Sequence, residues 1–161
     1  MGFRLFEQRI LLLKQLGPLL CGCVINCVLS VAWTVFSCRL LRVEGVVARS
    51  LVSRFVTLPM AVPVTEALQG SVPLATLAAS LQAILAATIC LHLLDGMHVH
   101  GRLARGIALG GNAHALGTAA AAVDEPCIAS LAALAFLLCG TIMSLLVQVQ
   151  PLARAVMFLL P

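Results

Sequence analysis

The chain has 161 residues, of which 61% are hydrophobic and only 10% are Asp, Glu, Lys or Arg. A soluble domain has about 25% charged residues, so a water-soluble globular protein is excluded. The net charge of +4 does not indicate nucleic-acid binding, because the basic residues form short clusters between long apolar stretches rather than one basic face. At about 20 residues per crossing, the apolar content allows at most about five membrane spans.

Residues 1–16 have apolar side chains at helical spacing, with polar side chains between them, which predicts a short helix lying in the membrane interface. The stretch 17–38 is apolar and is closed by Arg39 and Arg42, which predicts the first spanning helix, with a loop to residue 45. A signal peptide is the alternative for this region. The apolar run is longer than the core of a signal peptide and no Ala-x-Ala cleavage pattern follows it, so we favour a spanning helix.

Two more clean spans are predicted at residues 72–94 and 127–149, and a short apolar tail follows at 150–161. Between the spans lie two irregular segments. Residues 46–70 are apolar but contain two prolines four residues apart, which break an ordinary helix because proline removes a donor and clashes with the preceding turn. Residues 103–123 carry four glycines together with Asn, His and Thr inside an Ala/Leu stretch.

An internal repeat relates residues 46–94 to residues 103–150. Each unit opens with an Ala-Arg pair, continues with an irregular segment and ends in a helix that begins at a proline, Pro73 or Pro126. Residue types in these two helices match at a fixed offset of 53 positions, for example Thr88-Ile89 with Thr141-Ile142. We therefore predict an all-α integral membrane bundle, a single domain over residues 1–161, with three full spanning helices and two broken or re-entrant segments in a two-fold internal repeat.

The two irregular segments are the predicted binding site. Irregular backbone at membrane depth persists only where protein buries it or where it lines a polar cavity. Such segments at corresponding places in two repeats are typical of a transport site, where half-helix ends direct backbone dipoles at an ion or an anionic substrate. The candidate substrate-binding residues are Arg54, Thr57, Pro59 and Glu66 in the first segment, and Arg105, Gly110, Gly111, Asn112, His114, Gly117 and Thr118 in the second.

Packing or interface roles remain open for part of this set. Gly106 and Gly110 have the Gly-x-x-x-Gly spacing of helix-packing interfaces. The two arginines are also typical of side chains that extend to the membrane interface. His114 together with Asn112 favours a functional role, because a polar pair in the middle of a segment is costly in lipid.

The seven cysteines lie in or beside apolar stretches, where Cys behaves as a small hydrophobic residue. Cys21, Cys23 and Cys27 form the one tight cluster, and the sequence has no second Cys/His pair at the spacing of a zinc site. The histidines near residues 92–100 fall in a short loop, where solvated side chains are the default. We therefore predict no metal, no cofactor and no covalent chemistry.

Residues 104–119 read Ala-Arg-Gly-Ile-Ala-Leu-Gly-Gly-Asn-Ala-His-Ala-Leu-Gly-Thr-Ala, and this stretch resembles the signature of the LrgB family. Residues 54–61 resemble the family's Lys-Ser-Val-Thr-Thr-Pro-Ile-Ala stretch, and residues 4–9 resemble its internal Pro-Leu-Tyr-Lys-Gln-Arg. The usual N-terminal helices of the family are therefore expected to be missing from this chain. The sequence departs from the family pattern at Phe55, where the family has Ser, at Leu58, where it has the second Thr, and at residues 111–112, where Gly-Asn replaces Thr-Ser. If those hydroxyl groups contact the substrate, the identity of the substrate differs in this chain.

The family contains bacterial antiholin-like modulators of murein hydrolase export, bacterial pyruvate-uptake components and a plastid glycolate/glycerate translocator. The resemblance implies a membrane transporter, not an enzyme, for small monocarboxylates such as glycolate, glycerate or pyruvate, working by alternating access at the two broken helices. The alternatives are an antiholin-like regulator that acts with a holin-like, LrgA-type partner, and a nonfunctional fragment. The implied location is the plasma membrane of a bacterium or the plastid inner envelope of a photosynthetic eukaryote. The implied partners are the lipid bilayer and either an N-terminal half or further copies of the chain. Nucleic acid is not expected as a partner.

Overall fold

The computed structural model describes residues 9–160, with side chains from Lys14 onward. All regular elements in this range are helices, which confirms the predicted all-α class. Three helical stretches are long and apolar enough to cross a membrane: Lys14–Leu40, Val72–Gly96 and Ala129–Gln148. The three spans expected from the sequence are therefore confirmed to within a few residues at each end.

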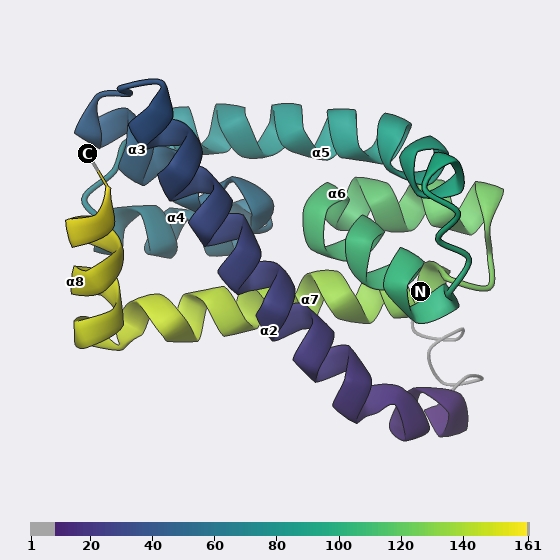
Figure 1. Ribbon diagram of the computed structural model, residues 1–161. Coiled ribbons are helices and arrows are strands. Elements are labelled where there is room, and N and C mark those ends of the chain that lie inside the picture. Colours follow the sequence, from purple (N-terminus) through teal and green to yellow (C-terminus); the bar gives the residue numbers. More distant parts are fainter. Residues whose placement is uncertain (1–8, 161) are drawn as a thin grey trace.

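The first helix, α2 (Arg9–Leu40), already includes the end of the segment predicted as an interfacial helix. Residues 1–8 of that segment lie outside the described residues. The apolar part of α2 has 27 residues, which at 1.5 Å per residue is about 40 Å, longer than the hydrocarbon core of a bilayer. A helix of this length is accommodated by tilting, and Figure 1 shows α2 crossing α7 obliquely.

The two other long helices, α5 (Val72–Gly96) and α7 (Ala129–Gln148), run in opposite directions on either side of the molecule (Figure 1). Helix α7 is the more central of the two, since half of its apolar window is buried against 22% in α2 and in α5. The outer faces of α2 and α5 expose large apolar side chains such as Leu29 and Leu85. Such faces are suited to contact with lipid rather than water.

A helical hairpin precedes α5 and is called hairpin 1. Its first arm is α3 (Gly45–Leu51) continued by the 3-10 helix η1 (Val52–Phe55), and its second arm is α4 (Leu58–Ala67). The chain is extended at the two residues between the arms, with φ and ψ of −108° and 146° at Val56 and of −59° and 145° at Thr57.

Buried hydroxyl groups join the two arms of hairpin 1. The hydroxyl oxygens of Ser53 and Thr65 lie 2.7 Å apart, and both residues are fully buried. Near the open end, the backbone N–H of Ser71 donates to Ser50 Oγ at 2.7 Å. These bonds pair buried polar groups across the two arms of the hairpin.

A second hairpin, hairpin 2, is formed by α6 (Arg102–Asp124). The helix is interrupted at His114, whose φ of 52° and ψ of −140° are far from helical values, and the chain reverses there (Figure 1). A Cβ atom on Gly117 would lie 2.5 Å from Ala113 Cβ, so glycine is needed where the two arms meet. A Cβ atom on Gly110 would lie 2.1 Å from Ala132 O, so this glycine allows α6 to pack closely on α7.

The apolar tail forms a short amphipathic helix, α8 (Gln150–Leu159), which lies across the end of α7 (Figure 1). Ala153 faces the core, while Phe158 is 85% exposed. This placement is typical of a helix lying in a membrane interface.

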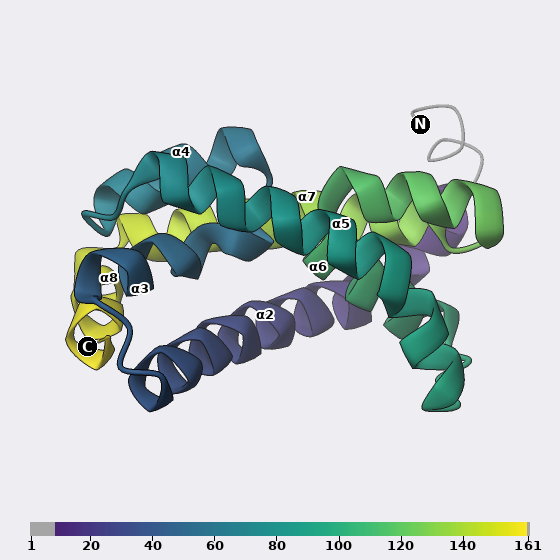
Figure 2. The same ribbon diagram turned by 90° about the horizontal axis from the view of Figure 1, so that it is seen from above.

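The order of a hairpin followed by a long helix thus occurs twice, as hairpin 1 with α5 and hairpin 2 with α7. The two hairpins enter from opposite ends of the long helices, and their tips face each other in the interior (Figures 1 and 2). The duplication of the sequence and the re-entrant position of the hairpins in a membrane stay predictions.

Candidate functional site

The tips of the two hairpins are in contact. The Nε2 atom of His114 lies 3.1 Å from the backbone oxygen of Arg54. Because a carbonyl oxygen only accepts hydrogen bonds, Nε2 carries the hydrogen and donates it. The other ring nitrogen, Nδ1, is left to accept a hydrogen bond when the ring is neutral, or to donate one when the ring is protonated.

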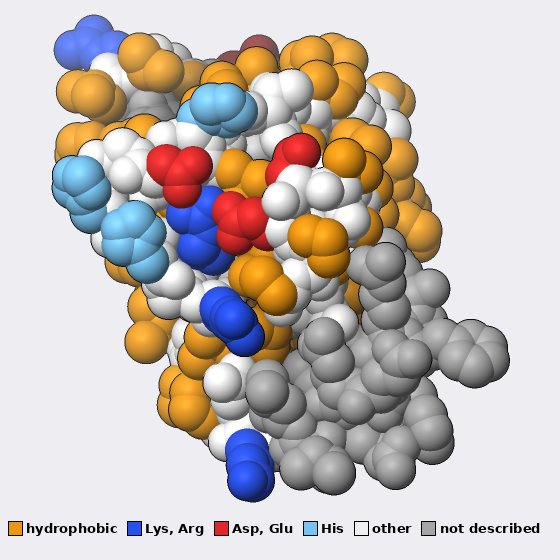
Figure 3. All heavy atoms as spheres, turned by 90° about the vertical axis from the view of Figure 1, so that its right-hand side faces the viewer, with side chains coloured by type: hydrophobic (Ala, Val, Ile, Leu, Met, Phe, Trp, Pro, Cys, Tyr) orange, Lys and Arg blue, Asp and Glu red, His pale blue; other side chains and the backbone are white. Residues whose placement is uncertain are grey.

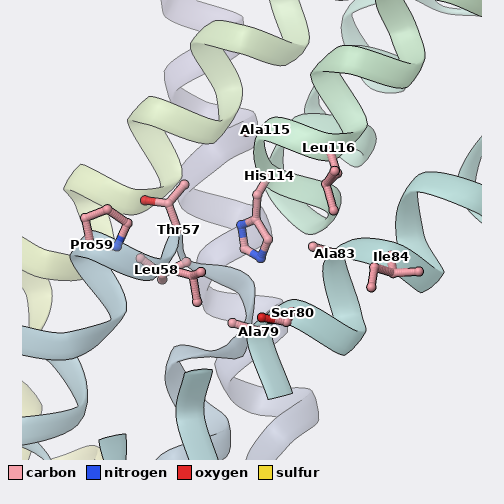
Figure 4. Close-up of a pocket in the computed structure, with 11 residues that line it drawn as sticks. Thr57, Leu58, Pro59, Ala79, Ser80, Ala83, Ile84, His114, Ala115 and Leu116 are labelled. Atoms are coloured by element: carbon pink, nitrogen blue, oxygen red, sulfur yellow. The ribbon is translucent and has the colours of Figure 1, made fainter. Parts of the chain in front are cut away.

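A cavity of about 300 Å³ lies against this contact. Its walls are the tip of hairpin 1, the tip of hairpin 2 and one face of α5, and Figure 4 shows the His114 ring between them. Three of the lining side chains are polar, those of Thr57, Ser80 and His114. The complete lining is Val56, Thr57, Leu58, Pro59, Ala79, Ser80, Ala83, Ile84, His114, Ala115 and Leu116.

Two helix N-termini border the same cavity. Helix α4 begins at Leu58, directly after Thr57, and the second arm of hairpin 2 begins after His114. A helix N-terminus carries roughly half a positive charge and has N–H groups without a partner in the helix. The lining contains no Asp or Glu side chain to neutralise these two ends. The first arms of both hairpins end at these tips, so their C-terminal ends offset part of this charge. The two N-termini supply backbone N–H groups from which an anion can accept hydrogen bonds.

A larger cavity, of about 690 Å³, lies along another face of α5. Its polar lining residues are Arg54, Gln82 and Asn112, and the rest of the lining is mainly apolar. The Arg54 side chain donates from Nη1 to the hydroxyl of Thr34, and to the backbone oxygen of Leu51 at 3.3 Å. Arg54 thus belongs to the second cavity, while its backbone oxygen holds His114 at the first.

Amide side chains connect hairpin 2 to two of the spans. Asn112 Nδ2 lies 3.4 Å from Asn26 Oδ1 on α2, and Gln82 Nε2 on α5 donates to the backbone oxygen of Asn112 at 3.3 Å. Sequence reasoning missed Asn26, Gln82 and Ser80. For Asn26 and Gln82, the available signal was an amide side chain inside a largely apolar span, which is costly unless it is paired.

Arg105 lies at the open end of hairpin 2 rather than at its tip. Its Nη1 donates to Asp95 Oδ1 at 2.6 Å and to the backbone oxygen of Val99 at 3.0 Å, and its Nε donates to Glu125 Oε2 at 3.1 Å. These two carboxylates raise the pKa of the guanidinium above its ordinary value. Figure 3 shows this end of the molecule, where basic, acidic and histidine side chains gather. The geometry favours a structural role for Arg105.

The other predicted residues divide into three groups. Thr57, Pro59 and His114 line the first cavity, and Arg54 and Asn112 line the second. The rest of the predicted set lines neither cavity: Gly110, Gly111, Gly117 and Thr118 are buried behind the tip of hairpin 2, and Glu66 is exposed near the end of α4.

In the described part of the chain, no group of three or more His, Cys, Asp or Glu side chains is arranged to hold a metal ion. The cysteines of this region are all free thiols. Among them, Cys23, Cys27 and Cys139 are buried where α2 meets α7.

Three apolar spanning helices, with polar groups enclosed between two hairpins, define an integral membrane protein. The family model described as LrgB-like family matches residues 1–152, and the chain belongs to this family. The chain is 28% identical over 157 residues to the plastidal glycolate/glycerate translocator 1, chloroplastic, of Arabidopsis thaliana. The match covers 97% of this chain and 31% of that protein. No solved structure matches the chain. The name of this relative refers to transport, and the activity of the present chain is a proposal.

Proposed function

We propose that this chain is a transporter of small monocarboxylates, which bind between the tips of the two hairpins. The observation that carries the proposal is the cavity at His114, where two helix N-termini and a histidine meet in otherwise apolar surroundings. A single carboxylate is the anion best matched to this site, because its oxygens accept hydrogen bonds from backbone N–H groups at both tips and from the hydroxyl of Thr57.

The roles of the side chains follow from their positions. The carboxylate lies at the N-termini of α4 and of the second arm of hairpin 2. The Thr57 hydroxyl donates to it, and His114 Nδ1 donates to it when the ring is protonated. Apart from Ser80, the remaining wall is built from Ala, Val, Ile, Leu and Pro, so a second negative charge would be buried without a charged partner. The site therefore selects small monocarboxylates over dicarboxylates.

The second cavity extends the path of the substrate. Arg54 places a positive charge on its wall, and Asn112 and Gln82 add hydrogen-bonding groups. A cation in a cavity with low-dielectric walls raises the local concentration of anions. We assign to Arg54 and Asn112 the attraction of the substrate towards the hairpin tips.

Alternating access fits the arrangement of the two units. Hairpin 1 with α5 and hairpin 2 with α7 point in opposite directions, as in transporters built from inverted repeats with the binding site at the repeat interface (Figure 1). The contact between His114 and Arg54 joins the tips, so separation of the hairpins would open the site to one side of the membrane.

The Arabidopsis relative is named for glycolate and glycerate, which supports these two acids as substrates. Pyruvate is the third substrate we propose, on the resemblance of the sequence motifs. Because the chain spans about a third of that relative, partners such as an N-terminal half or an LrgA-type protein belong to the proposal as well. The competing function is an antiholin-like regulator, which needs no cavity with anion-binding ends.

The test is uptake of labelled glycolate, glycerate and pyruvate into proteoliposomes that contain the purified chain. We expect saturable uptake of at least one acid, inhibited by unlabelled monocarboxylates and not by a dicarboxylate such as succinate. Protein-free liposomes give the background. Absence of saturable flux for all three acids, in a sample shown to be folded and inserted, would refute the transporter and leave the regulator.

A further inference from the structure

An apolar groove on the outer surface is separate from the two cavities at the hairpins. It has a volume of about 550 Å³ and runs between the second half of α2, the end of α7 and α8. Its walls include Val31, Met143 and Val156, and Arg39 is the one charged residue that lines it. The substrate path proposed above does not use this groove.

The position of the groove relative to the membrane follows from the helices that form it. Because α2 and α7 are spanning helices, the groove lies at the depth of the lipid acyl chains along most of its length. Arg39 is in the last turn of α2, and α8 crosses the end of α7 at the same side of the molecule (Figure 1). The charged end of the groove therefore lies at the level of the lipid headgroups.

The Arg39 guanidinium is held in place from one side. Its Nε donates to the backbone oxygen of Leu159 at the end of α8, at 2.7 Å. Within residues 9–160, neither Nη atom of Arg39 has a protein acceptor. Arg42, Arg49 and Arg154 are further cations outside the spans, and basic clusters next to spanning helices attract anionic lipids.

We propose that this groove binds an anionic phospholipid, with one acyl chain along α2 and α7 and with the phosphate bound by the Nη groups of Arg39. A guanidinium fork matches two phosphate oxygens, and the apolar walls match a hydrocarbon chain. A zwitterionic lipid fits less well, because its own ammonium group competes with Arg39 for the phosphate.

Native mass spectrometry of the whole chain tests the proposal, after exchange into detergent micelles doped with phosphatidylglycerol or with phosphatidylcholine. The wild-type chain is expected to retain phosphatidylglycerol in preference to phosphatidylcholine. Arg39→Gln should reduce this preference about fivefold, the effect of one basic group near a lipid surface. Arg39→Lys should keep most of it, and Arg42→Gln, which removes an exposed cation three residues away that does not line the groove, should reduce it much less than Arg39→Gln does.

A second pair of variants tests the groove itself. Ala32→Trp adds a large side chain from an exposed position in the groove wall and should lower retention of both lipids, whereas Leu29→Trp, on the outer face of α2, should not. Circular dichroism checks that each variant is folded.

Equal retention of the two lipids by the wild-type chain would overturn the proposal, as would equal effects of Arg39→Gln and Arg42→Gln. A change of oligomeric mass in Ala32→Trp without loss of lipid would also overturn it, because a second copy of the chain would then occupy the groove.

Discussion

His114 combines a backbone function with a side-chain function. Its backbone, with a φ of 52°, reverses the chain so that α6 becomes a hairpin. Its ring then reaches from the tip of one hairpin to the backbone of the other. Positive φ is uncommon in residues other than glycine, and such positions concentrate at functional sites where the surroundings stabilise them. We infer that the motif around His114 encodes the tip geometry as well as the binding group.

At the residue scale, the first prediction concerns helix packing. Gly110→Ala places a methyl group 2.1 Å from Ala132 O, so α6 and α7 must move apart. We expect a loss of about 1–3 kcal/mol in the free energy of unfolding, the usual cost of overpacking. Unfolding of the purified chain in mixed micelles measures it. Gly17→Ala is the matched control, since a Cβ atom there meets nothing within 4 Å; similar losses in both variants would contradict the packing role.

The sequence identified His114, Asn112, Thr57, Pro59 and Arg54 as candidates because polar groups and helix breakers are rare in apolar segments. It could not separate the tip of a hairpin from its open end. Arg105 has the same residue type as Arg54, but tertiary contacts with Asp95 and Glu125 decide that it closes the base of hairpin 2. The sequence did not predict a role for Asn26, because its partner, Asn112, is 86 residues away in the chain.

The departure from the family motif at residue 111 has a steric explanation. A Cβ atom on Gly111 would lie 2.6 Å from Asn26 Nδ2 on α2. The threonine that the family motif has there would displace Asn26 and disturb its contact with Asn112. We therefore expect Gly111 and Asn26 to be linked, with the α2 amide in this chain occupying the space of the missing hydroxyl side chain.

At the scale of elements, the two hairpins are closed at their open ends by arginines at corresponding places. Arg49 and Arg105 each follow an alanine, and each contacts a residue 20 positions later, Gln69 or Glu125. The closures differ in strength, because Arg49 Nη1 lies 3.5 Å from a neutral amide, whereas Arg105 binds two carboxylates. Hairpin 2 is therefore the more firmly closed of the two.

This difference gives a prediction for Arg105→Gln. Removal of the buried cation leaves the carboxylates of Asp95 and Glu125 unpaired. We expect a loss of about 1–3 kcal/mol, below the usual cost of breaking a buried pair because the Asp95 side chain is 63% exposed. Amide hydrogen exchange should rise throughout residues 102–124. Arg49→Gln serves as the comparison and should have a smaller effect on residues 45–67. An equal or larger effect in hairpin 1 would contradict the assigned closure.

The sequence predicted the elements well where composition decides and less well where tertiary contacts decide. The long apolar runs placed the three spans, and prolines and glycines located the two irregular segments. The tail at 150–161 was expected only as an apolar stretch, yet it forms the amphipathic helix α8. The positions of the breaks, at Val56 and at His114, depend on contacts between the hairpins that no local pattern reveals.

At the scale of the whole molecule, the opposite directions of the two units predict opposite accessibility. Glu44 lies at the open end of hairpin 1, and His100 precedes hairpin 2 at the other end of α5. We expect Glu44→Cys and His100→Cys to react with a membrane-impermeant maleimide from opposite sides, in intact spheroplasts and in inverted vesicles. Both variants carry Ser in place of the exposed Cys21 and Cys127. Reaction of both positions from the same side would refute the inverted arrangement.

Transport by this chain, as proposed here, requires that the hairpin tips form the monocarboxylate site. The most direct measurement is the initial rate of uptake by His114→Ala in proteoliposomes, with whichever of glycolate, glycerate and pyruvate the wild-type chain transports. We predict a rate at the level of protein-free liposomes, with the variant inserted and folded, while His100→Ala, in an exposed loop, keeps the wild-type rate. Normal uptake by a folded His114→Ala would contradict the assigned site.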